Sequence, residues 1–253
     1  MGSGHSEHLH IEGDSPLHRL PATAKLVGLV LFVFGVVAVP GPAFIPLGLL
    51  LLLAVAILAS TGVPARQLLP RLSVEIPFLV FALALPFVAM GERTQVGPFA
   101  LSLPGLTGAW TLAAKGTIGV LCGVAFAVTT TSRDFVEAMQ RLKVPGLLVA
   151  VLAFMIRYTS IVTDELRRMR VAQASRGFNS RSVRGWPVLA NGIGALFVRS
   201  YERGERVHLA MLSRGYTGAF TLEDRAVAQP AQWALALTPA ILAATLAAGV
   251  RLA

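Results

Sequence analysis

The stretch "AFIPLGLLLLLAVAILAST", residues 43–61, contains no charged side chain. About 20 apolar residues in a helix cross the hydrocarbon core of a bilayer, so this stretch predicts a membrane-spanning helix. Four other stretches of the chain have comparable length and hydropathy. They are residues 22–39, 74–90, 108–131 and 233–250. The sequence therefore predicts an all-α membrane protein with about five transmembrane helices.

The composition supports a bilayer as the main environment. Hydrophobic residues make up 55% of the chain and charged residues only 14%, whereas a soluble domain carries about 25% charged residues. The net charge of +9 is typical of cytoplasmic loops in a membrane protein rather than of a nucleic-acid site. The single cysteine, Cys122, excludes a disulfide framework. No small-residue cleavage pattern follows the first apolar stretch, so we expect no cleaved signal peptide.

Positive charges orient the predicted spans. Arg19 precedes the first span and Lys25 lies in its first turn, and Arg66 and Arg71 follow the second, whereas the connector between these spans is uncharged. Since basic residues mark the cytoplasmic side, we expect the N-terminus in the cytoplasm of a bacterium, with the chain crossing its inner membrane several times. The expected parts are a polar cytoplasmic N-terminus (1–21), transmembrane helices 1–4 (22–131, with an outer loop at 91–106), a cytoplasmic module (132–228) and transmembrane helix 5 (229–253).

The module at residues 132–228 holds 15 of the 22 basic residues and eight of the 13 acidic ones. Its apolar run, residues 144–156, is too short to favour a span and has basic residues on both flanks. Crossing would place one basic cluster outside, against the positive-inside rule. We therefore predict that this run stays in the cytoplasm, and six spans remain the alternative to five.

Three helices are expected in this module. Ser132 is the expected N-cap of the first, which Pro145 stops. The second runs from about Leu147 to Ser175, and the third from about Pro187 to Ser213. Apolar residues of the third follow a helical spacing that predicts one stripe, formed by Leu189, Ile193, Leu196, Phe197, Tyr201 and Val207.

The second and third helices of this module end with the same sequence motif, Ser-Arg-Gly. Ser175-Arg176-Gly177 and Ser213-Arg214-Gly215 are each followed by an aromatic residue. Glycine after a helix adopts the left-handed conformation that ends it, and an arginine in the last turn interacts favourably with the helix dipole. Helix ending alone explains either triplet, but it explains the repetition less well. Two like tips with a rigid cation suggest two like acceptor sites on partners.

Two longer segments carry a family resemblance. "RYTSIVTDELRRMRVAQASRGF" (157–178) and "LFVRSYERGERVHLAMLSRGYTG" (196–218) resemble the two coupling segments of energy-coupling-factor (ECF) transporter T components. The opening "SPLHRLPATAKL" (15–26) is most similar to the cobalt-transport branch, the CbiQ type. The resemblance covers residues 14–220 and includes both motifs in the family's order.

The resemblance implies a scaffold of an ABC-type importer that links two cytoplasmic ATPases to a separate substrate-capture membrane subunit, here of a cobalt-binding type. Arg176 and Arg214 would be the residues that dock on the ATPases, with Ser175 and Ser213 replacing the family's alanine. The chain has no G-x-x-x-x-G-K-[ST] phosphate loop. We expect it to be a non-enzymatic subunit without catalytic residues, cofactor or metal site.

Several alternatives stay open at this stage. Nickel or a vitamin could replace cobalt as substrate, and the histidines at positions 5, 8, 10 and 18 could ligate Co²⁺ or Ni²⁺, although a solvated end without function is favoured. Lys115 and Glu75, inside predicted spans, fit snorkelling or a packing bond better than a transport role. A self-contained channel or an intramembrane enzyme is the rival class, and the spans offer it few ionisable groups.

Overall fold

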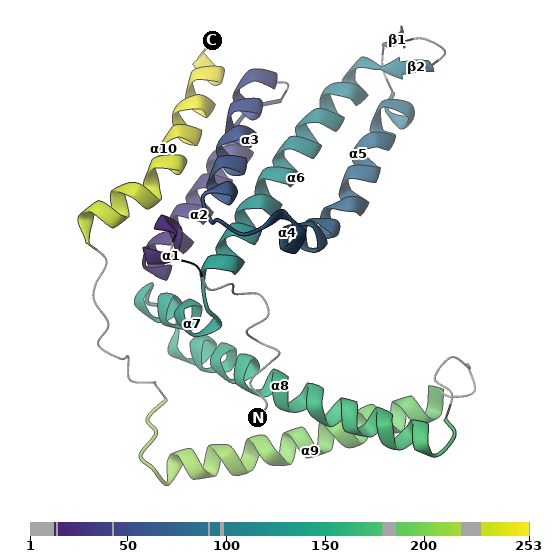
Figure 1. Ribbon diagram of the computed structural model, residues 1–253, viewed down its shortest axis with the longest axis vertical. Coiled ribbons are helices and arrows are strands. Elements are labelled where there is room, and N and C mark those ends of the chain that lie inside the picture. Colours follow the sequence, from purple (N-terminus) through teal and green to yellow (C-terminus); the bar gives the residue numbers. More distant parts are fainter. Residues whose placement is uncertain are drawn as a thin grey trace. The chain divides into compact units, whose positions relative to one another are not determined.

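The computed structural model describes residues 13, 15–41, 43–90, 92–96, 99–178, 186–218 and 229–252. These residues form two compact units. The bundle unit contains the described residues within 9–138 and 225–253, and the helix-pair unit contains those within 139–224. Figure 1 shows that both units are built almost entirely from helices. The prediction of an all-α membrane protein is confirmed.

The elements of the bundle unit follow the predicted spans closely. They are α1 (Pro16–Arg19), α2 (Ala22–Ala38), α3 (Phe44–Ala59), α4 (Ala65–Leu72), the 3₁₀ turn η1 (Ser73–Glu75), α5 (Ile76–Val88), β1 (Arg93–Val96), β2 (Phe99–Ser102), α6 (Leu103–Thr129) and α10 (Pro230–Leu252). Helix α7 (Ser132–Arg141) leads along the chain from this unit to the helix-pair unit.

The core of the bundle lies between α2, α3, α6 and α10. Its largest fully buried side chains are Phe32, Leu47, Leu50 and Ile118. Helix α6 packs against α2, α3 and α5, and α10 packs along α2. Because α6 contacts three of the other long helices, it is the central helix of this unit.

Glycines allow α2 and α10 to approach closely. A Cβ added at Gly28 would lie 2.3 Å from the carbonyl oxygen of Ala236, and one at Gly35 would lie 2.7 Å from Ala243 Cβ. Small residues at a helix contact are typical of membrane bundles, where close backbone packing replaces the hydrophobic driving force. The alanine-rich face of α10 is therefore held directly against the backbone of α2.

The lengths of the apolar helices agree in part with five spans. Within the described residues, four helices are long and apolar enough to cross a membrane: residues 66–88, 103–129, 146–175 and 230–252. Helices α2 and α3 are shorter, with 17 and 16 residues. By length and composition, residues 146–175 could therefore also cross the membrane. The positive-inside rule instead assigns them to the cytoplasm. The five-span arrangement thus stays a prediction.

Two local expectations were wrong. The outer segment at residues 91–106 was expected to be a loop, but Arg93–Val96 and Phe99–Ser102 pair as an antiparallel hairpin, and Leu103 already begins α6. The N-cap of α7 is Thr131 rather than Ser132, because the Thr131 hydroxyl accepts a hydrogen bond from the Asp134 amide at 3.1 Å. Both residues are good N-caps, so the sequence alone does not choose between neighbours.

Long cationic side chains of the bundle bond to helix C-termini. Lys115 Nζ donates to the carbonyl oxygens of Val37 and Val39 at 2.9 and 2.8 Å. Arg251 donates to Ala38 O at 3.1 Å, at the same end of α2. Lys25 Nζ donates to Thr129 O at 2.7 Å, at the last residue of α6. These carbonyls have no partner within their own helix, so Lys115 makes a packing bond, one of the two predicted alternatives to a transport role.

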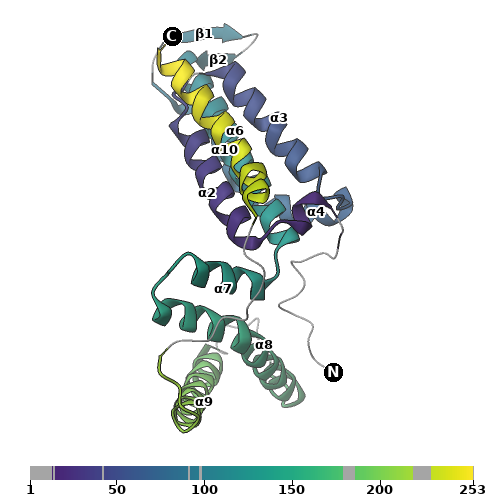
Figure 2. The same ribbon diagram turned by 90° about the vertical axis from the view of Figure 1, so that its left-hand side faces the viewer.

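The helix-pair unit consists mainly of α8 (Gly146–Ser175) and α9 (Trp186–Leu212). Both bounds agree with the predicted helices within two residues. Figures 1 and 2 show that α8 and α9 run in roughly opposite directions and cross at an angle. Their C-terminal ends lie at opposite ends of the pair (Figure 1).

The predicted single apolar stripe of α9 is divided between two faces. Leu189, Leu196 and Val207 are partly buried, whereas Ile193, Phe197 and Tyr201 are exposed. The i, i+4 spacing of the second set turns it away from the partly buried face. The periodicity therefore identified the helix correctly but not which of its apolar residues contact α8.

Candidate functional site: two matched helix tips

The first candidate tip is the C-terminus of α8. The Gly177 amide donates to Ala174 O at 3.0 Å, and the Phe178 amide donates to Gln173 O at 3.1 Å. Gly177 has φ +74°, in the left-handed region that glycine adopts without strain. These two bonds and the positive φ define a Schellman motif, which satisfies carbonyls at the helix end.

The second tip, at the C-terminus of α9, repeats this arrangement bond for bond. The Gly215 amide donates to Leu212 O at 3.0 Å, and the Tyr216 amide donates to Met211 O at 3.0 Å. Gly215 has φ +80°. The predicted role of both glycines as helix-ending residues is therefore confirmed.

The serines of the two motifs also behave alike. Ser175 Oγ donates to Ala172 O, and Ser213 Oγ donates to Ala210 O, both at 2.9 Å. Each hydroxyl is thus bonded back to its own helix. Because each serine hydroxyl bonds to its own helix, it does not occupy the side chain of the neighbouring arginine.

Arg176 and Arg214 are exposed at the two helix ends. No described residue makes an ion pair or a side-chain hydrogen bond with either guanidinium. A guanidinium has five donors in a planar fork, suited to carboxylates and to clustered carbonyl oxygens. The tips therefore present two exposed guanidinium groups on closely similar backbone supports. The structure does not bring them together into one site, because they terminate opposite ends of the helix pair (Figure 1).

The backbone after the second tip contacts the start of α8. A Cβ added at Gly146, the first residue of α8, would lie 3.6 Å from Gly218 O. The chain that follows Tyr216 therefore lies in van der Waals range of the other helix's first turn.

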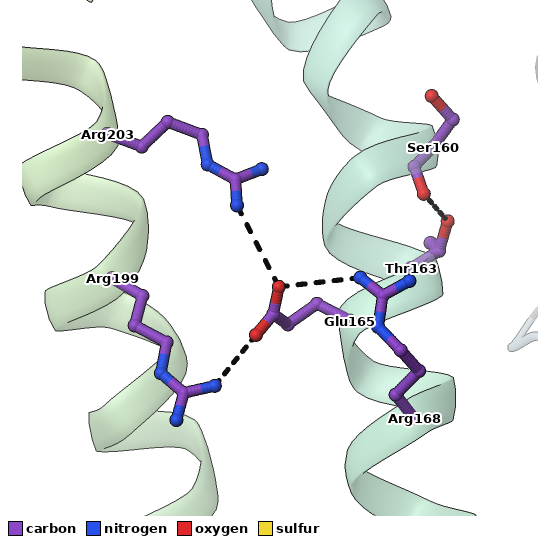
Figure 3. A network of polar contacts seen from close by, with 6 residues as sticks. All are labelled: Ser160, Thr163, Glu165, Arg168, Arg199 and Arg203. Atoms are coloured by element: carbon purple, nitrogen blue, oxygen red, sulfur yellow. Dashed lines mark hydrogen bonds and ion pairs between the residues drawn. The ribbon is translucent and has the colours of Figure 1, made fainter. Parts of the chain in front are cut away.

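A cluster that the sequence analysis missed joins α8 to α9. Glu165 of α8 lies 2.8 Å from Arg199 and 3.9 Å from Arg203, both on α9, and 3.6 Å from Arg168 of its own helix. Figure 3 shows the carboxylate between the three guanidinium groups. The hydrogen bond from Arg199, and then the positive charges around it, hold the pKa of Glu165 below its usual range. Glu165 and Arg199 are 34 residues apart in the sequence, so no local sequence pattern indicates that they pair.

A second ion pair lies within α9. Arg206 lies 3.8 Å from Glu202, four residues earlier on the same helix, and both side chains are largely exposed. Such a pair supports one helix by tenths of a kcal/mol. It does not connect α9 to α8.

The ionisable residues of the bundle lie in packing positions. Glu75, at the start of α5, is buried and accepts a hydrogen bond from the hydroxyl of Thr117 on α6. Cys122 is buried as well. No group of three His, Cys, Asp or Glu side chains among the described residues is arranged to hold a metal ion. The histidines at positions 5, 8 and 10 lie outside the described residues.

Comparison with known proteins agrees with these motifs. The sequence model of the family CbiQ, cobalt transport protein, matches residues 13–224. The cobalt transport protein CbiQ of Rhodobacter capsulatus is 29% identical over 243 residues, which cover 93% of each chain. An energy-coupling factor transporter transmembrane protein of Bacillus selenitireducens is 27% identical, over 89% of this chain and 88% of that protein.

One further relative carries another name. A putative ABC transporter ATP-binding protein of Bifidobacterium longum is 29% identical over 173 residues, which are 64% of this chain but only 22% of that protein. The family match covers most of the chain, including both tips and all of α2 to α9. The apolar helices and these relatives make the chain a multi-pass membrane protein. It belongs to the CbiQ family of cobalt transport proteins, the transmembrane T components of energy-coupling-factor transporters.

Proposed function

We propose that this chain is the energy-coupling subunit of an ECF importer and that Arg176 and Arg214 each dock on one of two ATP-binding cassette ATPases. The observation that carries the proposal is the identity of the two tips. Both use the same Schellman bonds, the same serine back-bond and one exposed arginine. Helix ending requires the glycine but not the arginine, so a repeated arginine favours two equivalent acceptors.

The chemistry of the tips suits a contact that transmits force. A charge-assisted bond to a carboxylate is about twice as strong as one between neutral groups, and the guanidinium fork makes it directional. The Schellman motif fixes the backbone of each arginine at the C-terminus of its helix. A partner that moves one tip therefore moves the helix behind it.

Separate subunits would hydrolyse ATP in this account. The sequence has no P-loop motif, and in the Bifidobacterium relative the matching region is about a fifth of a protein named for ATP binding. We infer that here the ATP-binding part is supplied by partner chains, one at each tip. The chain itself would then act without catalytic residues.

Cobalt is the proposed cargo, taken up through a separate substrate-capture membrane subunit. The family description and the name of the Rhodobacter relative support cobalt. Nickel or a vitamin is the second candidate, because the relative from Bacillus selenitireducens carries only the general transporter name. We assign cargo selection to the capture subunit rather than to the bundle. The described lysines of the bundle, Lys25 and Lys115, bond to carbonyl oxygens at helix ends and so have packing roles.

Reconstitution tests this assignment. The chain should be expressed with the ATPases and the capture subunit encoded in the same genome, and uptake of radioactive cobalt, nickel and vitamins measured. We expect ATP-dependent cobalt uptake that is lost when any one subunit is omitted. Uptake by this chain alone would contradict the proposal and favour a self-contained carrier.

A further inference from the structure

The carboxylate of Glu165 is the only acidic group that bridges α8 and α9 among the residues that the structure describes. Its side chain is 18% exposed, whereas its three arginine partners are each more exposed. Two of the partners belong to α9 and one to α8 (Figure 3). One negative charge thus lies within reach of three positive charges on two helices.

Little apolar packing fixes the crossing otherwise. No described residue of α9 is fully buried, and the buried residues of α8 are Val149 and Ala150, near its start. Beside the ion cluster lies a cavity of about 340 Å³, lined in part by Phe154, Tyr158, Arg203 and Val207. A crossing that lies beside an open pocket, with no fully buried side chain from α9, depends more than usual on its polar contacts.

Removal of the carboxylate would reverse the sign of the local electrostatics. With Glu165 present, each arginine is attracted to the same oxygen pair. Without it, Arg168, Arg199 and Arg203 would leave three like charges at the point where the helices cross. Like charges at short range repel, so the expected change is a rearrangement of the crossing rather than the loss of one weak contact.

The geometry converts a small change at the crossing into a large one at the tips. Arg176 lies 11 residues after Glu165, about 16 Å along α8, and Arg214 lies 15 residues after Arg199, about 22 Å along α9. A rotation of about 10° around the crossing would therefore displace each tip by about 3–4 Å. A displacement of this size exceeds the tolerance of a bidentate hydrogen bond.

We propose that Glu165 is a positioning residue that sets the crossing of α8 and α9 and so the separation of the two arginine tips. This inference rests on the proposed function only for its consequence, which is that the tips engage two ATPases together. The crossing itself is a property of this chain alone. It can therefore be measured without any partner.

The test is a distance measurement on the full chain in lipid nanodiscs. Spin labels at Val171→Cys and Leu209→Cys, each five residues before a tip arginine and each exposed, report the separation in a Cys122→Ala background. Wild type should give a narrow distribution. Glu165→Gln should broaden it. Losing an exposed ion pair alone raises the population outside the wild-type range about two- to fivefold, and repulsion among the three arginines should add to this.

Glu202→Gln is the matched control, because its carboxylate pairs with Arg206 within α9 alone. It should keep the wild-type distribution. Arg199→Gln removes one positive charge and leaves the carboxylate with Arg168 and Arg203, so it should broaden the distribution less than Glu165→Gln does. A distribution for Glu165→Gln that equals that of Glu202→Gln would overturn the inference.

A second readout separates this inference from the proposed function. In the assembled transporter, Glu165→Gln should lower transport-coupled ATP hydrolysis while single ATPases still bind. If Arg176→Ala and Arg214→Ala leave ATPase binding intact, the proposed function fails, whatever the distance data show. If these variants lose binding but Glu165→Gln changes neither distance nor coupling, only the positioning role of Glu165 fails.

Discussion

Different interactions stabilise the bundle unit and the helix-pair unit internally. In the bundle, large apolar side chains are fully buried and glycines bring α2 and α10 into backbone contact. In the helix-pair unit, described residues of α9 are at most partly buried, and an ion cluster joins it to α8. The bundle thus has the features of a rigid anchor, and the helix pair those of an element whose geometry responds to charge and to partners.

Cysteine labelling should show in an all-or-none manner that the helix pair lies outside the bilayer. In a Cys122→Ala background, Ala195→Cys places an exposed thiol on α9. Five spans predict that only reagents that reach the cytoplasm modify it. Ser180, which follows α8 in the sequence, lies outside the described residues, so the label is placed on α9 instead. Modification of Ala195→Cys from the outer side alone would mean that α8 crosses the membrane.

The close contact of α2 with α10 should be the most sensitive point of the bundle. Gly28→Ala would place a Cβ 2.3 Å from Ala236 O, and overpacking of this kind typically costs about 1–3 kcal/mol. We expect a clear fall in the unfolding temperature of the purified protein. The control is Gly123→Ala on α6, where a Cβ meets no atom within 4 Å, and it should be neutral or slightly stabilising.

Substitution of Lys115 should have a smaller effect on stability, and it distinguishes a packing role of this residue from a transport role. Lys115→Met would leave the carbonyls of Val37 and Val39 without their donor. Val39 is buried, and an unpaired buried polar group costs about 1–3 kcal/mol. We expect lower thermal stability, with cobalt uptake reduced only in proportion to the folded protein. Loss of uptake at unchanged stability would instead assign Lys115 a transport role.

Acid should affect the helix pair only at low pH. The pKa of Glu165 is lowered by its bond to Arg199, so its contribution is fully present above the unfolded value of about 4.3. It is lost as pH falls through the lower folded value. The groups facing it are Arg168, Arg199 and Arg203, which stay charged throughout. The label separation should therefore be constant between about pH 5 and pH 8, and broadening already near pH 6 would contradict this assignment.

The sequence was sufficient for the fold because hydropathy and helix signals act locally. The apolar helices of the bundle, both long helices of the helix pair and the left-handed glycines Gly177 and Gly215 could all be predicted from runs of a few residues. The hairpin at residues 93–102 was missed because its polar, proline-containing sequence also fits a loop. The choice of Thr131 over Ser132 as N-cap was missed because adjacent hydroxyl residues have similar propensities.

The candidate site was predictable only in part. The repeated triplet and the family resemblance pointed to Ser175, Arg176, Gly177, Ser213, Arg214 and Gly215, and their contact with partners stays a prediction. Glu165 was not found, because its partners Arg199 and Arg203 lie on another helix and no periodicity connects them. The division of the apolar residues of α9 into two faces was missed for a similar reason, since it depends on where α8 crosses.

The central claim is that the two arginines hold two ATPases, and retention of ATPase on the purified membrane subunits tests it most directly. If each guanidinium is seated in an acceptor groove, its removal costs about 2–5 kcal/mol, a roughly tens- to thousands-fold loss of affinity. Arg176→Lys and Arg214→Lys should restore binding only in part, because an ammonium lacks the planar fork. The matched control is Arg170→Ala with Arg206→Ala, which removes two exposed arginines of the same helices outside the tips. We predict that Arg176→Ala with Arg214→Ala loses nearly all ATPase while the control keeps it; wild-type retention by the double tip variant would contradict the account.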